Sequence, residues 1–168
     1  MFKQWNTFMD ACFSPVDREK LEGVFGAFFV GEPSLIGKTV YIYGPPGSGK
    51  TSFGQIISKM MNYSYCKDLF RMYDDLDPKF ITHALESFTL ILTNKEPTEH
   101  MLESDRYIIV HSQKGNLSPE EYERCMYALR VGWVIAREMC TATYLSKLYD
   151  RQYDAYTNLI KNGCCTSS

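Results

Sequence analysis

The sequence lacks a strong excess of charge of either sign. Among its 168 residues, 18 are basic and 20 are acidic, which leaves a formal net charge of −2. A protein that binds nucleic acid over much of its surface usually has a strong positive field, and this composition provides none. Any contact with DNA or RNA is therefore expected to be local, or to be assembled across several subunits.

The sequence also lacks the patterns of a secreted, membrane-spanning or zinc-binding protein. Its six cysteines show no CxxC spacing, its three histidines have no ligand spacing with cysteine or carboxylate, and residues 1–5 show no secretory signal organisation. The longest apolar runs, such as 25–30 and 131–136, fall far short of the roughly 20 residues that a spanning helix needs. We expect a soluble protein with reduced thiols and no transmembrane segment.

What the sequence does contain is an alternation of strand-like and helix-like segments. Aliphatic or β-branched runs predict strands at 39–43, 89–93 and 107–110, with a weaker candidate at 66–73. Helical patterns are predicted at 14–30, 51–61, 77–86 and 118–161. The nearly all-apolar run at 89–93 is typical of a strand buried on both faces. Because strands that alternate with helices favour a parallel sheet, we predict an α/β fold.

One motif in this alternation indicates a specific chemistry. Residues 44–51, GPPGSGKT, match GxxxxGK[ST] in full, and a predicted strand precedes them while a predicted helix comes directly after. Backbone amides in such a loop form a concave anion site at the helix N-terminus, and glycines let the chain approach phosphates closely. The alternative is a chance glycine-rich turn.

The motif predicts ATP and Mg²⁺ as cofactors. Lys50 would neutralise the β- and γ-phosphates, and the Thr51 hydroxyl would hold the metal. The predicted nucleotide-binding residues are Gly44, Pro45, Pro46, Gly47, Ser48, Gly49, Lys50, Thr51 and Ser52. The chain then divides into a helical lead-in at 1–36, a P-loop core at 37–114, a C-terminal helical extension at 115–163 and a tail at 164–168.

Acidic residues come after the strand candidate at 66–73. Asp74 would support Mg²⁺, while Asp75 would orient or deprotonate the attacking water. The alternative is a solvated turn that leads into a helix capped by Asp77, and Arg71 does interrupt the apolar run.

Two further polar residues lie next to predicted strands. Asn94 ends the run at 89–93, where its amide would position water against the γ-phosphate, although asparagine is also an ordinary turn residue. Arg106 precedes the strand at 107–110. It would stabilise charge on the phosphates of a neighbouring subunit, or pair with Asp105 or Glu103 on its own surface.

Together these motifs resemble the superfamily 3 helicases of small viruses, which are AAA+ replication ATPases found in papillomavirus, polyomavirus and parvovirus initiators. A strand with GPPGSGKT, then Asp-Asp, then ILTN with a following proline, then LESDR before an aliphatic strand, occur in the family's order over roughly residues 18–136. The resemblance implies that Lys50 and Thr51 are the Walker A pair and Asp74 and Asp75 the Walker B acids. Asn94 would then be the polar sensor and Arg106 the finger acting in trans.

The resemblance also implies a biological setting. Members form ring-type homo-oligomers that hydrolyse ATP between subunits and remodel DNA or RNA during viral or mobile-element replication, in the cytoplasm or the host nucleus. The sequence departs from the family between Asp75 and Asn94, where 18 residues leave no room for the usual DNA-binding hairpin. The Asp-Asp-Leu triplet is also similar to that of ATPases from positive-strand RNA viruses, which belong to the same superfamily.

Two other functions fit the phosphate loop. A small phosphotransferase of the nucleotide kinase kind would be of this size, but more than forty residues precede the loop and no arginine-rich lid lies within 114–124. An ATP-gated assembly module with slow turnover would fit the shortened middle segment. We further expect five large side chains of the C-terminal helices to pack in the core rather than to stack on bases, namely Met126, Tyr127, Trp133, Met139 and Tyr144.

Overall fold

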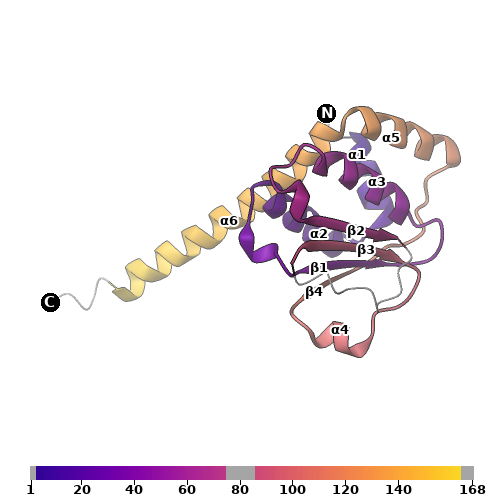
Figure 1. Cartoon of the computed structure of the whole chain (residues 1–168). Helices are drawn as coiled ribbons and strands as arrows, with labels where there is room; N and C mark the ends of the chain where they lie inside the picture. The colour runs from indigo at the N-terminus through magenta and orange to yellow at the C-terminus, as the bar shows by residue number, and fades with distance from the viewer. Residues whose placement is uncertain (1–2, 75–85, 164–168) are drawn as a thin grey trace.

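The computed structural model describes residues 3–74 and 86–163. Within them the chain forms a four-stranded parallel sheet, with helices before, between and after the strands (Figure 1). The strands are β1 (Thr39–Tyr43), β2 (Phe70–Asp74), β3 (Phe88–Thr93) and β4 (Tyr107–His111). The helices are α1 (Lys3–Cys12), α2 (Pro15–Phe29), α3 (Lys50–Met61), α4 (Glu99–Glu103), α5 (Pro119–Val131) and α6 (Trp133–Gly163), with short 3-10 turns η1 (Pro33–Leu35) and η2 (Lys67–Leu69). The prediction of a mixed α/β fold with a parallel sheet is confirmed.

The strands lie in the order β2-β3-β1-β4. Val40 of β1 lies beside Leu90 of β3 and Ile108 of β4. All six residues of β3 are buried, which confirms the prediction of a strand covered on both faces. Helices α1, α2, α3, α5 and α6 contribute to the main core on one face of the sheet, while Met101 of α4 packs against the other face. Because the strands are parallel, the loops that leave their carboxyl ends gather along one edge of the sheet.

Two of the predicted helix starts have the expected caps. The Asp17 amide donates to Ser14 Oγ at 3.3 Å, with Pro15 in the first helical position. At α5 the Glu121 amide donates to Ser118 Oγ and the Ser118 amide donates to Glu121 Oε2, at 3.2 and 3.1 Å. This reciprocal pair is a capping box, and it fixes where the chain turns into α5.

Other predictions need correction. The strand candidate at 66–73 begins only at Phe70, because residues 67–69 form η2. The helix predicted over 118–161 is two helices, because Gly132 is the C-cap of α5, with φ of −99° and ψ of 27°, and α6 begins at Trp133. Tyr127 is exposed rather than packed in the core. The predicted helix at 77–86 lies almost entirely outside the described residues, as do Asp75 and the tail at 164–168.

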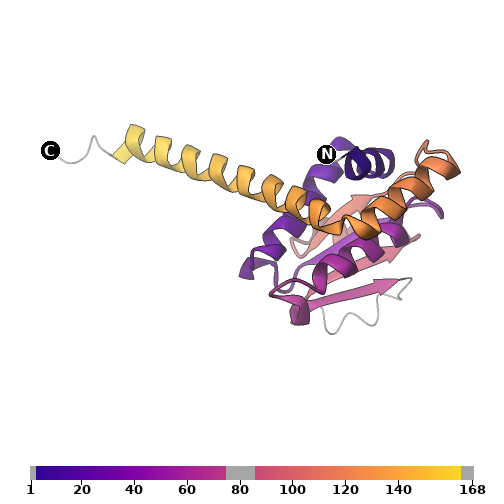
Figure 2. The ribbon, with the colours of Figure 1, turned by 90° about the horizontal axis from the view of Figure 1, so that it is seen from above.

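The first half of α6 packs closely along α2 (Figure 2). The contact depends on Gly26, because a Cβ there would lie 2.8 Å from the Tyr144 Cβ and closer still to the Cys140 carbonyl oxygen. Because the nearest neighbouring atoms are backbone, no flexible side chain can move aside to accommodate an added methyl group. Gly23, one turn earlier, faces only the end of the Lys147 side chain, with Nζ at 3.4 Å.

Gly26→Ala is therefore expected to lower the free energy of unfolding by about 1–3 kcal/mol or more, because the added methyl overpacks the α2–α6 contact. Gly23→Ala is the matched control on the same helix. It should leave stability unchanged or raise it by up to about 1 kcal/mol through helix propensity. Urea unfolding followed by circular dichroism measures both, and equal stabilities of the two variants would contradict the packing argument.

Among the described helices, none combines the length and the apolar character needed to cross a lipid bilayer.

Candidate functional site

A pocket of about 540 Å³ opens at the carboxyl edge of the sheet, in front of residues 46–52. One side of it is polar and is formed by this loop together with Asp74 and Asn94. The other side comes from the end of α1, the segment after β4 and the start of α5, with lining residues Ala11, Cys12, Lys114, Gly115, Leu117, Pro119 and Tyr122. The structure thus brings most of the predicted nucleotide-binding residues to one concave site.

The loop between β1 and α3 is closely packed between the ends of β3 and β4. The Gly44 amide donates to the Thr93 carbonyl at 3.2 Å, which ties the loop to the end of β3. A Cβ on Gly44 would lie 3.0 Å from the Ser112 carbonyl carbon and closer to its oxygen. On the same side, Ser48 Oγ and Ser112 Oγ are 2.6 Å apart and share a hydrogen bond. The ends of β3 and β4 therefore hold the loop on both sides.

Two glycines of the loop have positive φ, and they face different surroundings. Gly47 has φ of 76°, and a Cβ on it would meet no heavy atom within 4 Å, so its backbone is open to an approaching ligand. Gly49 has φ of 84° and caps the start of α3. A Cβ on Gly49 would lie 2.6 Å from Cys12 Sγ, so α1 leaves space for glycine alone.

Lys50 is buried within the loop. Its Nζ donates to the carbonyls of Gly44 and Pro45, both at 2.8 Å, and to Ser48 Oγ at 3.2 Å. The ammonium group is therefore held inside the curve of the loop.

The first turn of α3 carries two hydroxyl groups beside the pocket. Thr51 is exposed and lines the pocket, while Ser52 Oγ shares a hydrogen bond with Tyr122 Oη of α5. Burial raises the pKa of the Tyr122 hydroxyl, so this group stays protonated at ordinary pH. The bond between Ser52 and Tyr122 fixes the start of α5 over the start of α3.

Asp74 and Asn94 both lie at carboxyl ends of strands. Strand β3 lies between β1 and β2, so Asn94 lies between the loop and Asp74 along the edge. Both side chains are exposed to the pocket. The turn after β3 is fixed by Tyr41, whose Oη donates to the Lys95 carbonyl at 2.9 Å. Asp75, the second predicted acid, lies outside the described residues.

Arg106 lies at the opposite edge of the sheet. Its carbonyl accepts from the Thr39 amide at 2.8 Å, at the start of β1, whereas the loop leaves the end of β1. A five-residue strand spans roughly 16 Å, so this side chain does not line the pocket of its own chain. Within the described part of the chain, Arg106 forms no ion pair with Glu103 or Asp105.

Helix α1 closes the pocket behind Gly49. Cys12 is buried at its end, and the Cys12 carbonyl accepts from the Gln113 amide at 2.8 Å, which joins α1 to the segment after β4. Burial raises the pKa of the Cys12 thiol to about 11, with a smaller contribution from Cys125. The thiol is therefore neutral and acts as part of an apolar wall.

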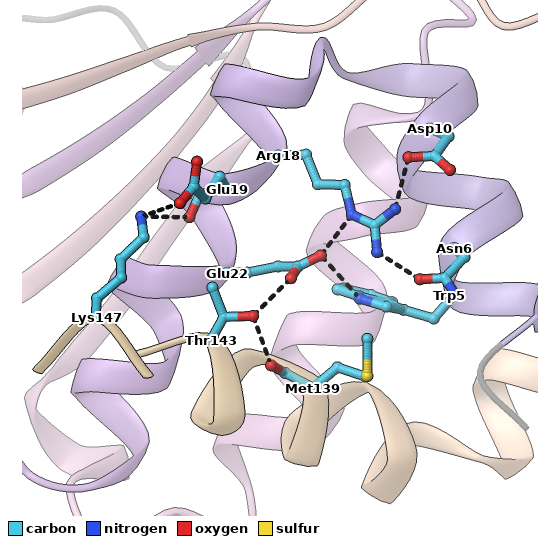
Figure 3. Close-up of polar contacts among 9 residues, drawn as sticks. All are labelled: Trp5, Asn6, Asp10, Arg18, Glu19, Glu22, Met139, Thr143 and Lys147. Carbon is cyan, nitrogen blue, oxygen red and sulfur yellow. Dashed lines mark hydrogen bonds and ion pairs between the residues drawn. The ribbon is translucent and has the colours of Figure 1, made fainter. Parts of the chain in front are cut away.

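A buried carboxylate holds α1 in this position (Figure 3). Glu22 of α2 accepts from Trp5 Nε1 of α1 at 3.3 Å, from Arg18 Nε at 2.6 Å and from Thr143 Oγ1 of α6 at 2.9 Å. Arg18 also pairs with Asp10 Oδ1 at 2.6 Å and donates to Asn6, both on α1. Because a buried charge without partners is costly, these contacts fix α1 and α6 on α2 together.

The α1 and α5 sides of the pocket have no counterpart among the predicted site residues. The buried residues of α1, Trp5, Phe8, Met9 and Cys12, have helical spacing, so α1 itself was detectable. No sequence signal shows that its last turn contacts residue 49.

The chain matches no family model, no curated protein and no solved structure.

Gly49→Ala is expected to destabilise the protein more than Gly47→Ala. Both substitutions put a side chain at positive φ, at a cost of order 1–3 kcal/mol, but only residue 49 also meets Cys12. The difference in unfolding free energy between the variants should be about 1–3 kcal/mol, the usual cost of overpacking. Adding Cys12→Ala should recover part of that difference in a double-mutant cycle measured by urea unfolding. If the changes in unfolding free energy of Gly49→Ala and Cys12→Ala are strictly additive, Cys12 does not restrict the side chain at position 49.

Proposed function

We propose that this protein binds ATP with Mg²⁺ and hydrolyses it, as a P-loop ATPase of the AAA+, superfamily 3 helicase-like kind. In this proposal hydrolysis takes place between identical subunits and is coupled to the remodelling of nucleic acid during viral or mobile-element replication. The observation that carries the proposal is the position of residues 44–51 in the fold. They come directly after a central parallel strand, open a helix and face Asp74 and Asn94 across a pocket.

The pocket has the size that a nucleoside triphosphate requires, with a polar end and an apolar end. About 540 Å³ lies within the usual range for small-molecule sites. The amides after Gly47 and the Lys50 ammonium supply the phosphate end. Leu117, Pro119 and Tyr122 supply an apolar surface for a base at the other end.

The residues present also fit Mg²⁺. Thr51 and Asp74 would hold it, together with phosphate oxygens and water, because Mg²⁺ prefers oxygen ligands and needs few from the protein. Among the described residues no group of three His, Cys, Asp or Glu side chains could hold a metal ion by itself. When bound, the metal supplies positive charge at the β- and γ-phosphates.

The chain's own side chains would then carry out distinct tasks. Lys50 would neutralise charge that grows on the γ-phosphate, and Asn94 would orient the attacking water. Asp75 would take the proton from that water, an assignment that rests on the sequence alone.

The position of Arg106 supports hydrolysis at a subunit boundary. It lies at the edge of the sheet away from its own pocket and, among the residues that the structure describes, pairs with neither neighbouring acid. An arginine in that position would complete a site only on an adjacent copy, as an arginine finger does.

Lys50→Ala should abolish the thermal stabilisation caused by Mg·ATP. A ligand at 100 times its dissociation constant stabilises the folded state by about 2.7 kcal/mol, and loss of the ammonium group should remove nearly all of this. Lys67→Ala changes an exposed lysine outside the pocket and should keep the full shift. The shift is measured by differential scanning fluorimetry as the difference with and without ligand, which cancels any effect of the mutation on the apo protein. An unchanged shift in the Lys50 variant would refute the proposed site.

Arg106→Ala should leave that ATP shift intact and slow hydrolysis by roughly 10³-fold, the usual contribution of an arginine finger. Lys38→Ala removes a cation at the same edge, where its Nζ contacts the Asp105 carbonyl at 2.8 Å, and should change turnover little. Mixing Arg106→Ala with Asp74→Asn subunits should restore part of the activity. Some sites then combine the intact Asp74 of an Arg106→Ala subunit with the intact Arg106 of an Asp74→Asn subunit.

Measurement of ATP hydrolysis also distinguishes the proposed ATPase from a phosphotransferase. Turnover that rises with protein concentration and with added single-stranded DNA supports the proposal. Turnover that is independent of concentration, unaffected by Arg106→Ala and accompanied by a phosphorylated small molecule would favour the phosphotransferase.

A further inference from the structure

The second half of α6 extends beyond the rest of the fold (Figures 1 and 2). Its first half is anchored on α2, with Ala136, Cys140 and Tyr144 buried. From Tyr149 to Gly163 every residue is exposed except the half-buried Thr157. Fifteen helical residues span roughly 22 Å, and a helix of that length without packing contacts is only marginally stable in water.

Large apolar side chains line one side of this projecting segment. We call this surface the tyrosine stripe, and it consists of Leu145, Tyr149, Tyr153, Tyr156, Leu159 and Ile160. Their side chains are 46% to 69% exposed. The spacing from Tyr149 to Tyr153, Tyr156 and Ile160 is four, three and four residues, which is the spacing of a coiled-coil seam.

Charged residues avoid the stripe. At 100° per residue, five of the six stripe residues fall within an arc of about 80°. The charges of the segment lie on the other side of the helix, and they are Lys147, Asp150, Arg151, Asp154 and Lys161. The buried residues of the first half, such as Cys140, lie on this same charged side, so the stripe points away from the face that packs on the chain's own domain.

The stripe continues into a groove on the domain. A cavity of about 540 Å³ lies beside the first half of α6, between Phe29 and Val30 of the α2 end and Val134 and Leu145 of α6. By helical phase Val134 and Ala142 share the face of the stripe. A largely apolar surface therefore runs along α6 from Val134 to Ile160. By helical phase Glu138 and Gln152 also lie on this face, and Arg137 lines the groove.

We propose that the tyrosine stripe pairs with the same stripe of a second copy of this chain, forming a short two-helix coiled coil. The stripe carries no charge, so two copies of it can pair without electrostatic repulsion. A surface with charges of one sign would repel its own copy. The other side of the segment has three basic and two acidic residues, so it lacks the cationic excess that binds an anionic membrane.

The area available is sufficient for a stable pair. The three tyrosines have side chains of about 150–250 Å² and the three aliphatic residues are smaller, so at 46% to 69% exposure a stripe residue offers roughly 100 Å² on average. Six residues on two copies then bury about 1,200 Å², the lower end of stable protein interfaces. Burial of the stripe would also supply the packing that the isolated segment lacks.

The test compares two double substitutions on the same turns of α6. Tyr153→Glu with Tyr156→Glu places charge in the stripe and should raise the dissociation constant of the pair by roughly 100-fold or more. Ala155→Glu with Asn158→Glu adds the same charge outside the stripe and should leave association unchanged. In the absence of nucleotide, sedimentation equilibrium at micromolar concentration is expected to give twice the chain mass of 19.4 kDa for the wild type and the control, and the chain mass for the stripe variant.

Several outcomes are decisive. A monomeric wild type at tens of micromolar, or a stripe variant that associates as the wild type does, would overturn the pairing. Flotation of a monomeric wild type with phosphatidylserine vesicles, lost in the stripe variant, would assign the stripe to a membrane surface instead. Lys50→Ala should still pair and the stripe variant should still show the Mg·ATP shift, so failure of the pairing and failure of the ATP site are distinguishable.

Discussion

The close approach of the loop 44–51 to the ends of β3 and β4 is the constraint on which the site depends. Gly44 passes so near the Ser112 carbonyl that no side chain fits there, and its amide bonds to the end of β3. This fixes the exit of the loop, and hence the place of Lys50 and of the first turn of α3. The same Ser112, directly after β4, shares a hydrogen bond with Ser48 in the middle of the loop. The close packing of these neighbours leaves the loop one path.

Local sequence patterns specified the parts of this arrangement that depend on one segment. The strands at 39–43 and 89–93 were predictable because their aliphatic runs suit burial in a parallel sheet. The caps at Ser14 and Ser118 were predictable because a hydroxyl, a proline and an acid at fixed offsets satisfy the first helical amides. The break at Gly132 was missed, since an isolated glycine is tolerated within a helix and its effect depends on how the next segment packs.

The site was predictable only as far as chain order determines it. That residues 44–51, Asp74 and Asn94 share one edge is a consequence of a parallel sheet, in which strand ends gather together. The contact of Cys12 with Gly49 and the bond from Tyr122 to Ser52 depend on how helices cross, which no local pattern encodes. Chain order does account for Arg106, which is separated from its own pocket because it lies before a strand rather than after one.

One polar group connects the pocket wall with the projecting helix. The Glu22 carboxylate accepts from Trp5 on α1, whose last turn contacts the loop, and from Thr143 on α6, whose far half carries the tyrosine stripe. A shared contact does not by itself couple two sites, because coupling requires an element with two arrangements whose balance both ligands shift. Glu22 is buried and accepts hydrogen bonds from three groups, and the structure gives no second arrangement for it among the described residues. This carboxylate therefore links α1, which lines the pocket, to α6, which carries the tyrosine stripe.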